Sequence, residues 1–208
     1  MSIYLAGGTL VIFSYLLGSV SFGLIITKMV KGIDIREYAS GSTGATNVMR
    51  ACGWRWGILA FVLDMFKAAL PLLIVIYIND FGIPTWIHPI MGLSAIFGHI
   101  WPIFTNFRGG KGMASGWSAL IVLSPWSGLI ACVLSLPFMI FTRYVSLGSI
   151  IGSLSGGIAI TTLSILGYIE PSYCAFGLVG SALTILKHKD NIIRLLNGSE
   201  RKIGATSD

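Results

Sequence analysis

The chain carries little charge: only 11% of its 208 residues are Asp, Glu, Lys or Arg, whereas 54% are hydrophobic. Soluble domains carry roughly 25% charged residues, and the mean hydropathy here is +0.82. This composition excludes a soluble globular domain and indicates an integral membrane protein. At this length we expect one transmembrane domain, residues 1–208, with no room for a second.

Cysteine and histidine are also scarce, with three residues of each. Cys52, Cys132 and Cys174 have no paired spacing, so no disulfide framework is expected. Cys52 is either a catalytic thiol or, as we favour, a small apolar side chain. The scattered histidines and few carboxylates form no metal-ligand set, so we expect neither a metal nor a cofactor. A Ser-His-Asp triad lacks the Gly-x-Ser-x-Gly turn after a strand.

Long apolar stretches predict an all-α bundle with seven spans. A helix needs about 20 residues to cross the hydrocarbon layer, so the fourth stretch is short and the seventh marginal. The fourth and fifth form either two crossings or a re-entrant hairpin, and both versions return the chain to the same side. The expected spans are residues 3–26, 56–78, 86–104, 113–123, 126–142, 145–166 and 172–186.

The positive charges are unevenly distributed between these spans. Thirteen of the fourteen Lys and Arg residues lie in four short segments, whereas the segments around Asp80 and Glu170 contain none. Short loops rich in Lys and Arg stay cytoplasmic. The asymmetry therefore predicts that the N-terminus lies outside and the C-terminus in the cytoplasm. The net charge of +6 fits this bias together with a bound anion, and we expect no nucleic-acid partner.

The fourteenth cation, Lys67, lies inside the second span, three residues after Asp64 and on the same helix face. Charges inside a membrane are costly and usually indicate function. Two hypotheses stay open: a structural ion pair, or support for a nearby site. His99 is expected to form a structural hydrogen bond, and His88, near the opposite surface, to have no role in the site.

The first cytoplasmic segment, residues 34–50, has the composition of a phosphate-binding loop. Glycine permits positive φ and leaves backbone N–H groups free. Such N–H groups, hydroxyls and the fork of an arginine suit phosphate oxygens. The residues concerned are Ser40, Gly41, Ser42, Gly44, Thr46 and Arg50.

In the second segment, Gly109, Gly110 and Gly112 surround Lys111 and precede the fourth span. Glycines let a backbone approach an anion, the ammonium group neutralises it, and the following helix N-terminus adds positive potential. This is not a Walker A loop, because Thr105 stands where the first glycine would be.

Two further segments complete the cytoplasmic set. His188 and Asn191 follow the last span and share a face if the helix continues. His188 is a candidate base or phosphate donor. Ser149 follows Arg143 at the start of the sixth span and is placed to reach a substrate, although serine there is also common in helix packing.

Together these segments resemble the acyl-phosphate:glycerol-3-phosphate acyltransferase family (PlsY) of bacterial phospholipid synthesis. The resemblance rests on the string Gly-His-x-x-Pro-x-Phe-x-x-Phe-x-Gly-Gly-Lys-Gly from Gly98 and on the tail His-x-x-Asn-Ile-x-Arg-Leu from His188. It implies a cytoplasmic-membrane enzyme that transfers a fatty acyl group from acyl phosphate to the sn-1 hydroxyl of glycerol 3-phosphate. The products are lysophosphatidic acid and phosphate, and the site faces the cytoplasm.

The resemblance also implies roles for individual residues. The catalytic set is Ser40, Lys111, His188 and Asn191. The substrate-binding set is Gly41, Gly44, Thr46, Asn47, Arg50, Gly109, Gly110, Gly112 and Ser149. Two positions depart from the family pattern: Ser42 replaces an amide side chain, and Ser21 stands where proline is common.

The expected chemistry needs little from the protein beyond binding. Acyl phosphate is already activated, so the site must orient the hydroxyl and stabilise the oxyanion. The proton goes either to His188 or, as we prefer, to a substrate phosphate oxygen. We expect a monomer in contact with membrane lipid. The alternative is a small transporter or channel for an anionic solute, although the candidate residues cluster at one surface.

Overall fold

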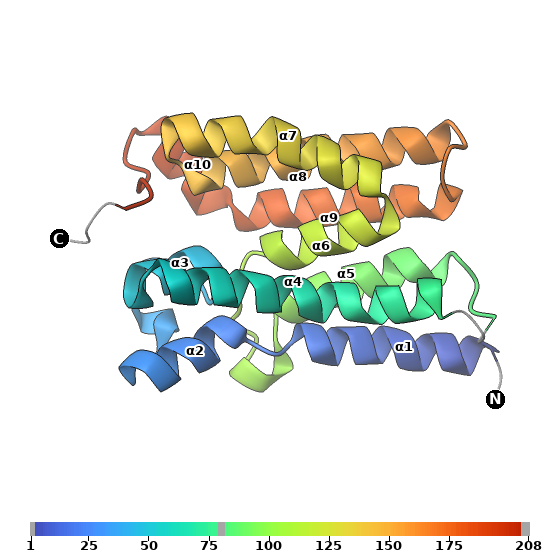
Figure 1. Ribbon diagram of the computed structural model, residues 1–208, viewed down its shortest axis with the longest axis horizontal. Coiled ribbons are helices and arrows are strands. Elements are labelled where there is room, and N and C mark those ends of the chain that lie inside the picture. Colours follow the sequence, from blue (N-terminus) through green and yellow to red (C-terminus); the bar gives the residue numbers. More distant parts are fainter. Residues whose placement is uncertain (1–2, 79–81, 205–208) are drawn as a thin grey trace.

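The computed structural model describes residues 3–78 and 82–204, and in these ranges the chain is helical. The long helices lie side by side along one axis, and the two ends of the chain lie at opposite ends of the bundle (Figure 1). Asp80, one of the two acidic residues that define the expected outer side, lies outside the described residues.

The bundle has two halves joined by one short helix (Figure 1). One half contains α1 (Ile3–Gly18), α2 (Phe22–Lys31), α3 (Ala45–Cys52), α4 (Trp54–Tyr77) and α5 (Ile87–Ile100). The other contains α7 (Pro125–Thr142), α8 (Val145–Ile165), α9 (Cys174–Lys187) and α10 (Lys189–Leu196). Between them, α6 (Met113–Leu123) contacts α4 and α5 on one side and α7, α8 and α9 on the other.

Five helical stretches are long and apolar enough to cross a membrane: Ile3–Lys31, Trp54–Tyr77, Ile87–Thr105, Pro125–Thr142 and Val145–Ile165. The short fourth stretch forms α6, whose 11 residues span about 17 Å, roughly half the hydrocarbon thickness. Figure 1 shows that α6 begins well inside the bundle, away from the end that carries α3 and α10. The loop before α6 therefore enters the bundle.

The first expected span, residues 3–26, is divided in the structure. Residues 19–21 separate α1 from α2, so backbone carbonyls are left without helical partners. The Lys67 ammonium donates a hydrogen bond of 2.6 Å to the Val20 carbonyl and forms an ion pair of 2.8 Å with Asp64. Both charged side chains are buried. The ion pair of these two residues is confirmed, and Lys67 also satisfies the broken helix, as a membrane interior requires. Support of the site by the same pair stays a prediction.

Close packing of α1 on α5 depends on two glycines. A Cβ atom at Gly18 would lie 2.4 Å from the Ala95 carbonyl oxygen, and one at Gly98 would lie 2.2 Å from the Tyr15 carbonyl oxygen. No side chain fits at either place. This contact fixes the C-terminal end of α5, which carries His99, against the helix break.

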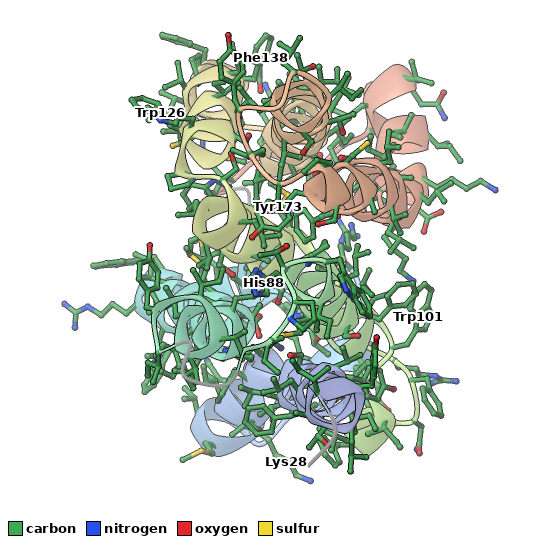
Figure 2. All side chains as sticks on the ribbon, turned by 90° about the vertical axis from the view of Figure 1, so that its right-hand side faces the viewer. Lys28, His88, Trp101, Trp126, Phe138 and Tyr173 are labelled. Atoms are coloured by element: carbon green, nitrogen blue, oxygen red, sulfur yellow. The ribbon has the colours of Figure 1, made fainter. Side chains whose placement is uncertain are left out.

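The opposite end of the bundle has its own buried polar contact. His88 stands at the start of α5, and its Nδ1 is 2.9 Å from the hydroxyl oxygen of Tyr173. Tyr173 belongs to the 3₁₀ turn Pro171–Tyr173. Viewed from that end, the two residues lie close together in the middle of the molecule, and Trp126 and Phe138 lie at its edge (Figure 2). His88 thus ties α5 to the turn before α9, at the end away from the candidate site.

The Asp64–Lys67 pair gives a test of this arrangement. Lys67→Met leaves the Asp64 carboxylate buried without a counter-charge, and we expect it to destabilise the protein by about 3–5 kcal/mol. The double variant Lys67→Met/Asp64→Asn removes both charges and should recover much of that loss. Unfolding in detergent, followed by tryptophan fluorescence, measures both. The single variant Asp64→Asn is measured in the same way. A double variant whose loss of stability equals the summed losses of Lys67→Met and Asp64→Asn would contradict the pairing.

Candidate active site

A cavity of about 520 Å³ lies where the two halves of the bundle meet. Its walls come from α3, α4, α6, α7, α8 and α10, from His99 on α5, and from the segments before α3, before α6 and after α10. Two of its lining residues, Ile58 on α4 and Leu136 on α7, are 48% and 44% exposed. The cavity therefore reaches the apolar outer surface of the bundle between α4 and α7.

The structure brings together most of the residues that the sequence nominates, although they come from four separate segments. At the polar end, the cavity is lined by Ser40, Gly44, Thr46, Asn47, Arg50, Lys111, Ser149, His188 and Asn191. Four nominated glycines, Gly41, Gly109, Gly110 and Gly112, are not among its described lining residues.

Gly109 and Gly110 instead pack against His99 at the end of α5. A Cβ atom at Gly110 would lie 2.1 Å from His99 Nε2, and the Gly110 N–H donates a hydrogen bond of 3.0 Å to the His99 carbonyl. His99 Nδ1 faces the Asp64 carboxylate at 3.6 Å. These contacts place Lys111, the next residue, at the cavity. Direct contact of these glycines with a phosphate stays a prediction.

The loop before α3 is shaped by Asn47. Its buried side-chain amide donates to the carbonyls of Ile35, Tyr38 and Ser42, at 2.9–3.2 Å, and its oxygen accepts from the Ser40 N–H. Asn47 thus uses its side-chain hydrogen bonds to hold the loop in shape. The loop in turn presents the Ser40 hydroxyl to the cavity.

Arg50 lies on the same side of the cavity, on α3, and is partly buried. Burial lowers its pKa, and nearby Arg201 adds to that effect; an arginine nevertheless stays charged at neutral pH. Among residues 3–78 and 82–204 it has no hydrogen-bond or ion-pair partner. A charged guanidinium without a partner beside hydroxyl groups suits an anion.

A chain of hydrogen bonds crosses the cavity from one half of the bundle to the other. The Lys111 ammonium donates to Asn191 Oδ1, and Asn191 Nδ2 donates to Glu200 at 2.7 Å. Glu200 also accepts hydrogen bonds from Arg194, at 2.8 Å, and Ser146, at 2.9 Å. Burial acts to raise the pKa of Glu200, but these three hydrogen bonds outweigh it, so the pKa is lowered and the carboxylate stays ionised.

Sequence reasoning missed four residues that line this end: Ser146, Arg194, Glu200 and Arg201. Three of them follow the last expected span, and the chain must turn back after α10 to bring Glu200 and Arg201 to the cavity. One sequence signal was present, because Glu200 is a single acidic residue among Arg194, Arg201 and Lys202. A lone carboxylate in a basic segment suggests an internal partner.

Burial makes Lys111 easier to deprotonate than an ordinary lysine. Its pKa is lowered from 10.5 to about 8, first by burial and next by the nearby Arg194. At pH 7 the ammonium is still charged. It loses its proton about two pH units earlier than a solvated lysine.

His188 is neutral, and its tautomer follows from one hydrogen bond. Its Nδ1 lies 2.7 Å from the Thr184 carbonyl, which can only accept, so Nδ1 carries the hydrogen and Nε2 has a free lone pair. Burial lowers the pKa of His188 to about 4; the Thr184 contact opposes this shift and Lys111 reinforces it. A neutral His188 with its hydrogen on Nδ1 offers Nε2 as a hydrogen-bond acceptor, and its role in the site stays a prediction.

The other end of the cavity is apolar. Ile58 and Phe61 line it from α4, Trp117 from α6, and Leu136 and Met139 from α7. Trp117 is held in place by a hydrogen bond of 3.1 Å from its indole N–H to the Gly128 carbonyl. One cavity thus joins a basic, hydroxyl-rich end to an apolar arm that reaches the surface.

Comparison with known proteins agrees with this geometry. The family model described as glycerol-3-phosphate acyltransferase matches residues 8–198. The glycerol-3-phosphate acyltransferase of Aquifex aeolicus is 42% identical over 193 residues, which cover 93% of this chain and 97% of that protein. The chain belongs to the glycerol-3-phosphate acyltransferase family. It is an acyltransferase and a multi-pass membrane protein.

Further relatives support the same conclusion. The glycerol-3-phosphate acyltransferase of Halalkalibacterium halodurans is 38% identical over 198 residues, which cover 95% of this chain and 96% of that protein. The crystal structure of PlsY, an integral membrane glycerol 3-phosphate acyltransferase, in its glycerol 3-phosphate form has a TM-score of 0.86 at 40% identity and 96% coverage of both chains. Its lysophosphatidic acid form has a TM-score of 0.82 at 39% identity, with the same coverage. These likenesses do not favour the anion transporter or channel.

The lowered pKa of Lys111 predicts an alkaline limit to activity. If the charged ammonium binds substrate, kcat/KM, which reports groups of the free enzyme, should fall about tenfold per unit above pH 8. Lys111→Arg keeps the charge at all accessible pH values, so its residual activity should show no such fall. Steady-state kinetics from pH 6 to 10 measure both. The same alkaline limit in wild type and Lys111→Arg would assign it to another group.

Proposed function

We propose that this enzyme takes its acyl group from acyl phosphate and transfers it to the sn-1 hydroxyl of glycerol 3-phosphate. The observation that carries the proposal is the form of the cavity, in which a basic polar end continues into an apolar arm that reaches the lipid-facing surface. An acyl phosphate has the same two parts. Its phosphate fits the polar end, and its alkyl chain fits the arm.

The charges at the polar end match two phosphate groups. Arg50, Lys111, Arg194 and Arg201 supply four positive charges, and Glu200 offsets one of them. A phosphate monoester carries about −1.5 to −2 charges near neutral pH. Arg194 is paired with Glu200, so Arg50, Arg201 and Lys111 remain to bind the phosphates. Lys111 binds a phosphate by turning N–H donors from Asn191 toward a phosphate oxygen.

In the proposed reaction the hydroxyl oxygen of glycerol 3-phosphate bonds to the acyl carbonyl carbon. The carbon–oxygen bond to phosphate then breaks, and phosphate leaves with the electron pair. Lys111 and the Ser40 hydroxyl are placed to stabilise the negative charge that develops on phosphate and carbonyl oxygens. The remaining question is which group takes the hydroxyl proton.

The lowered pKa of His188 supports one assignment of the proton. A base with a pKa of about 4 is weaker than a phosphate group, whose second pKa is about 6. We therefore assign the proton to a substrate phosphate oxygen. His188 accepts a hydrogen bond from the hydroxyl through Nε2 and orients it, so the role we assign to it is orientation, not phosphate binding.

We further propose seven membrane segments, with the N-terminus outside and the C-terminus and the site facing the cytoplasm of a bacterial inner membrane. The basic segments that line the cavity support this orientation, as do the opposite positions of the two termini (Figure 1). The proposed substrate-binding residues are those at the polar end, together with the glycines that place Lys111.

The direct test is phosphate release by purified protein that is given palmitoyl phosphate and glycerol 3-phosphate. Release should require both substrates. Lys111→Ala should lower kcat/KM by at least roughly 10²-fold, as for loss of one group that stabilises developing charge. The matched control is Lys28→Ala, which removes an exposed cation on α2 (Figure 2). Transfer from acyl-CoA but not from acyl phosphate would overturn the donor assignment.

The role of His188 has a separate test. If it orients the hydroxyl, His188→Ala should mainly raise KM for glycerol 3-phosphate and lower kcat by less than about 10²-fold. A general base is worth roughly 10²–10⁴-fold in rate. Steady-state kinetics with each substrate varied give both constants. A collapse of kcat at unchanged KM would instead make His188 the base.

A further inference from the structure

The last described residues form a strap, residues 199–204, that returns from α10 to the cavity. Helix α10 ends at Asn197 and Gly198, where a positive φ of 68° turns the chain back. The Ile203 N–H donates to the Arg143 carbonyl at 2.8 Å, and the Arg143 guanidinium donates to the Ile203 carbonyl, also at 2.8 Å. The strap is therefore pinned to the turn between α7 and α8.

Three strap residues, Glu200, Arg201 and Ile203, line the cavity, and Glu200 and Ile203 are at least partly buried. Lys202 is exposed, and its ammonium lies 5.6 Å from the centre of the Tyr144 ring. The turn to which the strap is pinned continues directly into Val145 and Ser146, which also line the cavity. Strap and turn together form one wall, and this wall is on the side of the phosphate-binding residues.

The chemistry of the proposed donor explains what such a wall is needed for. Acyl phosphate is a mixed anhydride that also reacts with water: the water oxygen bonds to the carbonyl carbon, phosphate leaves with the electron pair, and the products are a fatty acid and phosphate. A site that orients one hydroxyl and stabilises the leaving phosphate would assist this reaction too. Closing a site against water is the general means of preventing it.

We propose that the strap, held by the contact between Arg143 and Ile203, keeps water from the acyl phosphate and so makes the enzyme select the glycerol 3-phosphate hydroxyl over water. Arg143 and Ile203 are then specificity-determining residues for the acceptor. The inference rests on the proposed function, because it assumes an acyl phosphate in the cavity.

The test compares two products in one reaction, with palmitoyl phosphate as donor. The ratio of phosphate to lysophosphatidic acid is measured with glycerol 3-phosphate present, and phosphate release is measured without it. Wild type should give a ratio near one and little release without acceptor. Arg143→Ala removes one of the two hydrogen bonds, and we expect roughly a two- to tenfold rise in acceptor-independent release, the range for one lost hydrogen bond.

Two further variants separate this role from a general effect on folding. Ile203→Gly keeps the backbone contact but removes the side chain that covers the cavity, so it should raise the same ratio. Arg143→Lys retains a hydrogen-bond donor, so its ratio of phosphate to lysophosphatidic acid should lie closer to one than that of Arg143→Ala. Arg55→Ala, which removes an exposed arginine at the start of α4, should leave the ratio at one.

The outcomes are distinct. A folded Arg143→Ala or Ile203→Gly protein that loses both products in parallel, with the ratio still near one, would make the strap purely structural and overturn the proposal. Rapid acceptor-independent release by wild type would overturn it as well. Wild type that makes no lysophosphatidic acid from acyl phosphate would instead overturn the proposed function itself.

Discussion

The site depends on the hydrogen-bonded chain that runs from Lys111 through Asn191 to Glu200. Lys111 precedes α6, whereas Asn191 lies on α10, so this chain joins the two halves of the bundle at the cavity. A buried carboxylate is stable only when charges and hydrogen bonds compensate it, and Arg194 and Ser146 complete that compensation. Glu200 thus holds Asn191, the partner of Lys111, although this carboxylate does not itself need to touch a substrate.

The two glycines beside Lys111 show that the same residue type can serve two purposes. In the sequence, Gly109 and Gly110 beside Lys111 suggest a backbone that approaches an anion. In the structure, the space that their missing side chains leave is filled by the backbone and ring of His99. Both demands exclude a Cβ atom, and a sequence does not distinguish a glycine required by a ligand from one required by a neighbouring side chain.

The apolar segments were predictable because membrane crossing imposes a simple rule on composition and length. The short helix α6 has the bounds expected from the sequence, since Gly112 precedes it and Ser124-Pro125 follows it. The first span was predicted as one continuous stretch, although Gly18, Ser19 and Ser21 interrupt its apolar residues. The non-helical backbone of residues 19–21 is stabilised by Lys67, which is distant in the sequence, and by the close approach of Gly18 to α5.

The candidate residues with distinctive chemistry, such as Arg50, Lys111 and His188, were also predictable, because each stands in a polar segment between apolar ones. Glu200 was not, because its role arises only when the chain folds back on itself after α10, and the contacts of Ser146 and Arg194 with this carboxylate follow from the same fold. The reason is physical. A motif contains the residues with which one segment contacts a ligand, whereas the groups that hold two segments together are dispersed along the chain.

Burial lowers the pKa of both titrating groups at the site. It makes His188 a weak base with a pKa of about 4 and brings the pKa of Lys111 down to about 8. A phosphate dianion that enters the cavity reverses the effect on Lys111, because an opposite charge nearby favours the ammonium form. The same dianion is a better base than His188. In the proposed reaction, substrate binding supplies both the charge that keeps Lys111 protonated and the group that accepts the proton, and the protein's own part is to hold the hydroxyl and exclude water.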